Sequence, residues 1–254
     1  MATWKAGDES LIYYETHGRA DGGQNLLLLP GLLGAIDSQW RSFLQPLSRR
    51  YHIILTDLRG HGRSENNGLH LVPEQMVEDL IGLLAHLSVD SVHVAGYNLG
   101  GYLGLLMLLY RPRLVETLLM HATKFYWTDQ AAAAMRRQLN PDHLAQQAPA
   151  YANRLSDAHG ANRWRPLVRQ AADLAGYLAQ NPLSEAALRR VQAPVLVSVG
   201  DRDELVPVQE AFRLSRALPN GNLLVLPGVQ HPFRTLAPAL LLPMIEAFQR
   251  LQVL

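Results

Sequence analysis

Residues 96–101, GYNLGG, form the segment of this chain whose spacing most directly suggests chemistry. A nucleophile elbow is a sharp strand-to-helix turn, and it needs small residues two positions before and two positions after its tip. Gly96 and Gly100 occupy those positions, and Gly101 gives the following helix more room. The tip itself is Asn98, and asparagine tolerates the positive φ that such a tip requires. The segment therefore predicts an elbow whose tip carries an amide instead of a hydroxyl or thiol.

The elements that must position this turn are short apolar runs alternating with longer helix-like segments. Strand-like runs occupy residues 10–18, 25–31, 52–57, 91–96, 115–122, 194–200 and 222–228, and helix-like patterns occupy 73–87, 208–218 and 239–251. Strands separated by helices imply right-handed crossovers and helices on both faces of a sheet. The pattern predicts an α/β fold with a doubly wound, mostly parallel sheet.

One region, residues 124–190, breaks this alternation because it contains no strand candidate. Its segments 128–139, 140–160 and 164–180 are all helical in composition, and they follow the aromatic cluster Phe125, Tyr126 and Trp127. A wholly helical insert between two strands of a parallel sheet is typical of a cap. We expect one domain overall, with residues 1–123 and 191–254 forming the core and residues 124–190 forming a helical cap after the sixth strand of the core sheet.

Composition excludes several classes of function. The chain has 254 residues, a formal net charge of +1 and no cysteine, so disulfides, thiolate metal sites and a cysteine nucleophile are excluded. The even charge balance gives no reason to expect a nucleic acid or an acidic membrane surface as partner. The apolar run YLGLLMLLY is too short to span a bilayer, and MATWKAGDES lacks the apolar core of a secretory signal. We expect a cytoplasmic protein, and nothing here predicts its oligomeric state.

Five motifs occur in a recognisable order, each at the end of a predicted strand. They are LLLLPGLLG (26–34), LTDLRGHGRSE (55–65), GYNLGG (96–101), VSVGDRDELVP (197–207) and LPGVQHPF (226–233). In this set the chain resembles the α/β-hydrolase superfamily over essentially its full length. It departs from the family pattern at Pro30, which replaces a histidine, and at Asn98, where the family usually has a nucleophilic serine.

The resemblance implies roles for individual residues. His231 is expected to be the general acid and base, and Asp203 to orient its imidazole, with Asp201 as the competing carboxylate. The backbone N–H groups of Leu32 and Leu99 are expected to form the oxyanion hole. No metal and no cofactor is implied.

Other residues are candidates for the wall of a substrate pocket, with ordinary packing as the alternative for each. They are Tyr97, His121, Phe125, Tyr126, Trp127 and Trp164. Arg59, His61, Arg63 and Ser64 are expected to shape their loop through hydrogen bonds. The basic run Arg163, Arg165 and Arg169 is expected to be a solvated helix face.

Asn98 leaves four explanations open. The chain can be an inactivated form of a serine enzyme, or Asn98 can deamidate to an aspartate nucleophile, although the Leu99 that follows it argues against this. Alternatively, His231 and Asp203 can act as a base on water or on the substrate, which allows water-mediated hydrolysis or lyase-like chemistry. Finally, the site can serve only to bind a ligand. The resemblance favours a hydrolase of a small, partly apolar ester, lactone or related carbonyl compound, most similar to the capped esterases, lactonases and carbon–carbon bond hydrolases of the superfamily.

Overall fold

The computed structural model describes residues 2–19 and 23–250, and within them the chain forms an eight-stranded sheet. The strands are β1 (Ala2–Lys5), β2 (Leu11–Gly18), β3 (Gln24–Leu29), β4 (Tyr51–Thr56), β5 (Val92–Tyr97), β6 (Val115–His121), β7 (Val195–Gly200) and β8 (Gly221–Leu226). Their order across the sheet is β1-β2-β4-β3-β5-β6-β7-β8. Strands β3 to β8 pair in parallel, whereas β1 with β2 and β2 with β4 pair antiparallel. The predicted mostly parallel, doubly wound sheet is confirmed.

Strand β1 was not predicted, and its pattern explains why. It is four residues long, lies at the edge of the sheet, and alternates between half-buried and exposed residues. So short and half-exposed a run carries little periodic signal, and its pairing with β2 stabilises it. The seven predicted strands are present with ends shifted by at most two residues.

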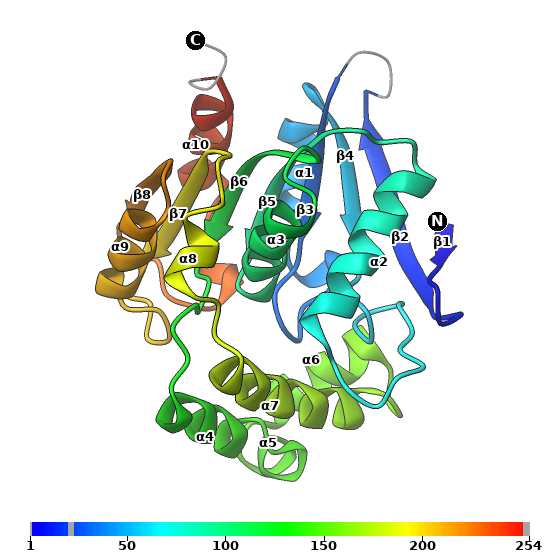
Figure 1. The fold of residues 1–254 in the computed structure, drawn as a ribbon. Coiled ribbons are helices and arrows are strands. Elements are labelled where there is room, and N and C mark those ends of the chain that lie inside the picture. The colour runs from blue at the N-terminus through cyan, green and yellow to red at the C-terminus, as the bar shows by residue number, and fades with distance from the viewer. Residues whose placement is uncertain (1, 20–22, 251–254) are drawn as a thin grey trace.

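Helices cover both faces of the sheet, as Figure 1 shows. Helices α2 (Pro73–His86), α3 (Leu99–Tyr110) and α9 (Val208–Ala217) belong to the larger apolar core, to which the short α8 (Glu185–Leu188) adds Leu188. Helices α1 (Arg41–Leu47) and α10 (Pro238–Arg250), with the 3₁₀ turns Ile36–Ser38 and Phe233–Thr235, belong to the second core. The predicted helix 239–251 corresponds to α10, and its last residue lies outside the described part of the chain.

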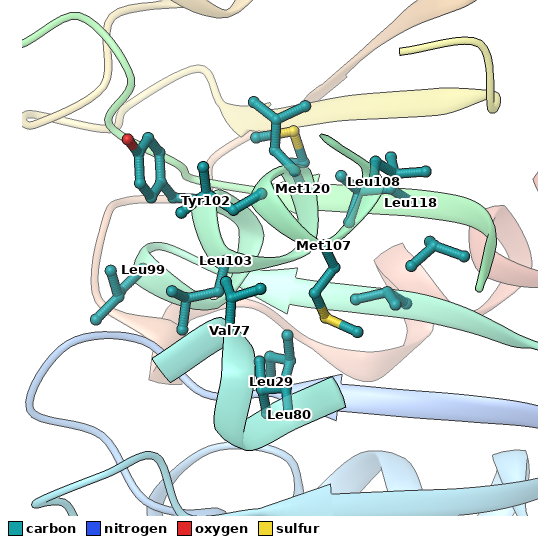
Figure 2. Close-up of a cluster of buried hydrophobic side chains, with 14 of the residues drawn as sticks. Leu29, Val77, Leu80, Leu99, Tyr102, Leu103, Met107, Leu108, Leu118 and Met120 are labelled. Atoms are coloured by element: carbon teal, nitrogen blue, oxygen red, sulfur yellow. The ribbon is translucent and has the colours of Figure 1, made fainter. Parts of the chain in front are cut away.

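Helix α3 follows the elbow and is the most deeply buried helix of the core. Its residues are apolar or glycine on nearly every side, which is the pattern of a helix enclosed by neighbours. In Figure 2 its Leu103 and Met107 lie among Val77 and Leu80 of α2 and Leu118 and Met120 of β6. This packing fixes the start of α3, and hence the elbow, relative to the sheet.

Between β6 and β7 the chain forms helices α4 (Asp129–Gln138), α5 (Pro141–Gln147), α6 (Pro149–His159) and α7 (Trp164–Gln180), followed by α8. Helices α4 to α7 gather beyond one end of the sheet, at the bottom of Figure 1. They have a small apolar cluster of their own, built on Leu144, Leu155, Trp164 and Val168. Among the described residues, no helix combines the length and apolarity needed to cross a bilayer.

Candidate active site

The elbow forms as its glycines predict. Strand β5 ends at Tyr97, Asn98 has a φ of 50°, and α3 begins at Leu99. A Cβ added at Gly100 would lie 2.5 Å from the carbonyl oxygen of Leu29 and 2.7 Å from that of Pro30. A Cβ at Gly96 would overlap the backbone of Gly100. Only glycine at these two positions lets strand and helix approach closely enough to hold Asn98 at the tip.

We expect Gly100→Ala to lower the free energy of unfolding by roughly 3 kcal/mol, because the atoms in its way are backbone oxygens that cannot rotate aside. Chemical denaturation followed by circular dichroism measures this change. The matched control is Gly7→Ala, since an added Cβ at Gly7 meets no atom within 4 Å. Equal stability of the two variants would show that the elbow does not need this close approach.

His231 and Asp203 form a hydrogen-bonded pair at the ends of different strands. Nδ1 of His231 lies 3.0 Å from Oδ1 and 2.9 Å from Oδ2 of Asp203. The Asp203 side chain is fully buried, and its Oδ1 also accepts the backbone N–H groups of Leu205 and Val206 at 2.9 and 2.7 Å. The carboxylate is therefore held rigidly and takes the proton on Nδ1 as its hydrogen-bond donor, which leaves Nε2 of His231 with a free lone pair.

Asp201, the competing carboxylate, does not contact this histidine. It lies on the surface, where its Oδ1 accepts the backbone N–H of Gly228 at 2.6 Å. The structure therefore brings Asp203, and not Asp201, to His231.

The amide of Asn98 joins the histidine to the loop after β3. Its Nδ2 lies 3.2 Å from Nε2 of His231, and its Oδ1 accepts the backbone N–H of Leu32 at 3.3 Å. Both contacts agree on the orientation of the amide, because Nε2 can only accept and the Leu32 N–H can only donate. The N–H of Leu99 stands at the first position of α3, where a backbone donor has no partner within its helix. Asn98 thus lies between His231 and the Leu32 N–H.

Residues 31–34 form the turn that presents the Leu32 N–H. Gly34 N–H donates to the Gly31 carbonyl at 2.9 Å, and Gly31 N–H donates to Oε1 of Gln39 at 2.8 Å. Leu33 has a φ of 60°, a left-handed conformation that turns usually assign to glycine or asparagine. A leucine in this conformation carries backbone strain, so contacts to the rest of the protein must hold it.

Tyr97 contacts His231, His121 stacks on Tyr97, and both are buried. The Tyr97 hydroxyl donates to the His231 carbonyl at 2.7 Å, and its ring stacks on that of His121 with centroids 6.1 Å apart. Nδ1 of His121 lies 3.0 Å from the hydroxyl of Ser198. Burial lowers the pKa of His121 to about 4, and burial raises the pKa of Tyr97. Both side chains are therefore neutral near pH 7.

The four aromatic candidates after β6 are spread over different surroundings. Phe125 packs against Tyr102 of α3, and the ring of Tyr126 lies beneath the guanidinium of Arg213 on α9. Trp127 donates from Nε1 to the Lys124 carbonyl at 3.1 Å. Trp164 is buried in the small apolar cluster that Leu33 also touches. The cluster that contains Trp164 therefore packs against the turn after β3, through Leu33.

Most of the loop after β4 is structural, as expected. Arg59 is buried and pairs with Asp79 at 2.7 Å and with Asp8 at 2.6 Å. Ser64 donates to the Asp57 carbonyl at 2.6 Å and accepts the Tyr13 N–H at 2.9 Å. These contacts tie the loop to the core.

Sequence reasoning missed three residues of the region 124–190 that reach toward the site. Tyr151 packs against the same small apolar cluster as Leu33, and its proximity to Tyr97 adds to the rise in the pKa of that hydroxyl, of which burial is the main cause. His159 and Arg163 hydrogen bond to the loop after β4. Arg163 is exposed, as expected of a solvated residue, but its guanidinium also donates to backbone carbonyls 99 and 101 residues away in the chain. No local periodicity signals such partners.

The arrangement supplies a base and backbone donors but no side-chain nucleophile. The His231 lone pair can accept a proton from a molecule that takes the position of the Asn98 amide, while the N–H groups of Leu32 and Leu99 can stabilise a developing oxyanion. Among the described residues, no group of three His, Asp or Glu side chains is placed to hold a metal ion.

Comparison with known families and proteins agrees with the fold. The family model described as alpha/beta hydrolase fold matches residues 24–157. Several relatives are named carbamate hydrolase RutD, among them the following two. The one from Agrobacterium fabrum is 26% identical over 90% of this chain and 94% of its own. The one from Pseudomonas savastanoi pv. phaseolicola is 30% identical over 85% of this chain and 90% of its own.

Solved structures share the fold. A thermophilic esterase from Thermogutta terrifontis superposes with a TM-score of 0.82 at 21% identity, covering 99% of this chain and 98% of its own. The enol-lactonase from Burkholderia xenovorans superposes with a TM-score of 0.76 at 16% identity, covering 99% of this chain and 98% of its own. At these identities the likeness concerns the fold alone.

Proposed function

Because the chain belongs to the α/β-hydrolase fold family of enzymes, we propose that it hydrolyses a small, partly apolar carbonyl compound by general-base catalysis from His231, with Asn98 in the place of the nucleophile. The observation that carries this proposal is the orientation of His231. Asp203 binds its Nδ1, so its Nε2 lone pair faces Asn98 beside the Leu32 N–H. A base held in this way is suited to remove a proton at the tip of the elbow.

Asn98 cannot form an acyl-enzyme. Its nitrogen lone pair is delocalised, and its amide oxygen is a poor nucleophile toward an ester. In the proposed reaction water attacks instead. His231 Nε2 accepts one proton of the water as its oxygen bonds to the substrate carbonyl carbon. The resulting imidazolium then gives that proton to the leaving alkoxide or amine as the carbon–heteroatom bond breaks, which restores neutral His231.

The oxyanion of the tetrahedral intermediate is assigned to the N–H groups of Leu32 and Leu99. In the structure the Leu32 N–H donates to Oδ1 of Asn98. Substrate binding therefore requires its carbonyl oxygen to replace the amide oxygen as acceptor. Nδ2 of Asn98 then remains available to hold the attacking water, which gives the asparagine a positioning role.

The substrate side of the site is assigned to residues 124–190 acting as a cap over a core of residues 1–123 and 191–254. Phe125, Tyr126, Trp127 and Trp164, with Tyr97 and His121 below, are the proposed pocket lining, which suits a small and partly apolar molecule. Esters, lactones and carbamates all present a carbonyl carbon bonded to oxygen, and relatives and fold neighbours carry the names of esterases, lactonases and carbamate hydrolases. A cytoplasmic location, expected from the lack of cysteine, is part of the proposal.

One observation favours a second candidate, a ligand-binding protein without turnover. The Asn98 amide donates to Nε2 of His231 and accepts the Leu32 N–H at the same time, so it occupies two of the groups that turnover would need. Such an arrangement costs energy to open and needs a ligand that reproduces both contacts.

The test is turnover of a panel of small esters, lactones and N-alkyl carbamates, with the first turnover resolved by rapid mixing and the protein examined by intact-mass spectrometry. We expect product to accumulate linearly without a burst and the protein mass to stay unmodified. A burst with a covalent adduct would contradict the water-mediated mechanism. No turnover together with saturable binding of the same compounds would favour the ligand-binding candidate.

A further inference from the structure

His159, the last residue of α6, joins three segments that are far apart in the sequence. Its side chain is fully buried. Its Nδ1 lies 2.8 Å from the backbone nitrogen of Gly62, in the loop after β4, and its Nε2 lies 3.1 Å from the carbonyl oxygen of Leu33, in the turn after β3. One imidazole therefore connects the helices between β6 and β7 to both loops of the core.

The two partners fix the protonation state of His159. The Gly62 N–H can only donate, so Nδ1 must accept. The Leu33 carbonyl can only accept, so Nε2 must carry the hydrogen. The bridge therefore needs the neutral imidazole with its hydrogen on Nε2. In the imidazolium form an N–H on Nδ1 would face the Gly62 N–H across 2.8 Å, and that contact would become repulsive.

One end of the bridge that His159 forms is the carbonyl of Leu33, the residue of the turn that carries the backbone strain. Leu33 is in the left-handed region, and its neighbour Leu32 donates its N–H to Asn98. A strained residue keeps its conformation only when surrounding contacts hold it. The hydrogen bond from His159 acts on the Leu33 carbonyl, which shares its peptide unit with the Gly34 N–H. That N–H donates to the Gly31 carbonyl at 2.9 Å, and the Gly31 carbonyl shares its peptide unit with the Leu32 N–H. The bridge therefore restrains the direction of the Leu32 N–H through this turn hydrogen bond.

Arg163 reinforces the same connection from the loop between α6 and α7. Its guanidinium donates to the Gly62 carbonyl at 2.5 Å and to the Ser64 carbonyl at 2.9 Å. Gly62 thus gives its N–H to one residue of this region and its carbonyl to another. The φ of Gly62 is +51°, and a Cβ there would overlap the Asp57 carboxylate, so only glycine can present both backbone groups at this buried position.

We propose that His159 is a positioning residue, which in its neutral form couples the helices over the site to the turn that aims the Leu32 N–H. The proposal rests on the proposed function in assigning Leu32 to the oxyanion hole. Loss of the bridge releases the strained turn and misdirects this donor, without removing any group that touches the substrate.

Because the bridge requires a neutral imidazole, its strength should depend on pH. Burial is the main cause that lowers the pKa of His159 below its ordinary 6.5, and the charge of Arg163 lowers it further, whereas the Leu33 carbonyl and Asp57 raise it. The ring of His61 lies 5.8 Å away, and burial lowers the pKa of His61 to about 3, so this neighbour stays neutral. A group with a depressed folded-state pKa contributes stability that is complete above the unfolded value near 6.5 and declines as the pH falls below it. The bridge should therefore weaken on acidification.

The experiment measures hydrogen exchange of the peptides that contain Leu32 and Gly62, as protection relative to the intrinsic rate, between pH 5 and pH 8. The variants are His159→Phe, which fills the space without polar atoms, and His159→Gln, whose amide can accept from Gly62 and donate to Leu33 but does not titrate. His143→Gln is the matched control, because His143 lies on the exposed surface of α5 in the same region. The same substitutions are placed in an Asn98→Ser background and assayed with p-nitrophenyl acetate.

We expect His159→Phe to lose roughly tenfold protection in both peptides at every pH. The native chain should lose protection only below about pH 6.5, His159→Gln should show no such loss, and His143→Gln should follow the native chain. In the assay, His159→Phe should lower kcat by roughly tenfold with little change in KM, and His159→Gln should restore it.

Unchanged exchange in His159→Phe, or the same acid-dependent loss in His159→Gln as in the native chain, would overturn the proposal. A changed exchange pattern with unchanged kcat would keep the bridge but refute its action on the oxyanion donor. Failure of the proposed function has a different signature, namely no turnover by the native chain while the exchange pattern and the kcat effects in the Asn98→Ser background remain as expected. If His159→Phe does not fold, the proposal is decided by comparing the pH dependence of hydrogen exchange in the native chain with that in His159→Gln.

Discussion

Asn98→Ser should raise kcat/KM for p-nitrophenyl acetate by at least about a thousandfold. Removing the nucleophile from an intact triad costs on the order of a million-fold in kcat, so restoring one to a site whose other parts are in place should recover much of that factor. Here the other parts are in place. His231 Nε2 already faces the side chain at position 98, and Asp203 holds the opposite nitrogen. Without the amide oxygen, the Leu32 N–H also becomes available to the substrate.

The control for Asn98→Ser is Asn98→Ala, which removes the amide without adding a nucleophile. It separates the effect of unblocking the oxyanion donor from the effect of the hydroxyl. A fluorophosphonate probe should label Asn98→Ser at residue 98 and should label neither the native chain nor Asn98→Ala there. If the serine variant gains no more activity than the alanine variant, the site does not assemble a working triad, and the assignment of His231 as its base fails.

His231→Ala should lower kcat by about a thousandfold for any substrate that the native chain turns over, with KM changed far less. A positioned general acid and base contributes on the order of a hundredfold to ten-thousandfold, and the alanine removes the only proton acceptor that the structure directs at Asn98 among the described residues. The steady-state parameters measured for the native chain and the variant check this. The same loss is expected in the Asn98→Ser background, where fluorophosphonate labelling should fall with it.

Asp203 offers a sharper version of this test, because the same loop contains a second carboxylate. Asp203→Asn should lower kcat by roughly a thousandfold or more, since the amide favours the wrong tautomer of His231. Asp201→Asn is the matched control. Asp201 is exposed and binds the Gly228 N–H, so its loss should leave kcat within about twofold. Equal losses in the two variants would mean that the loop as a whole, and not the pair with His231, controls the reaction.

The sequence by itself determined the fold, because the evidence for the fold is local. The continuous apolar runs specify buried parallel strands, and the glycines at 96 and 100 specify a close strand-to-helix turn whatever residue stands at its tip. The end of each strand is likewise a local feature, so the order of the motifs along the chain could be read directly. The edge strand β1 escaped notice because it is too short to show a period.

The tertiary structure alone decided which polar groups meet. Asp201 and Asp203 are two residues apart and have the same chemistry, but the turn at Gly200 sends one carboxylate to the surface and buries the other against His231. Asn98 could be identified as a replaced nucleophile, but its simultaneous contacts with His231 and Leu32 required coordinates. His159 gave no signal at all, since its partners lie 97 and 126 residues away. A hydrogen bond between distant segments leaves no periodic trace in either of them, whereas burial of a strand or helix face imprints a pattern on consecutive residues. For that reason the sequence could specify the scaffold, while the geometry that orients the base and aims the backbone donors emerged only from folding.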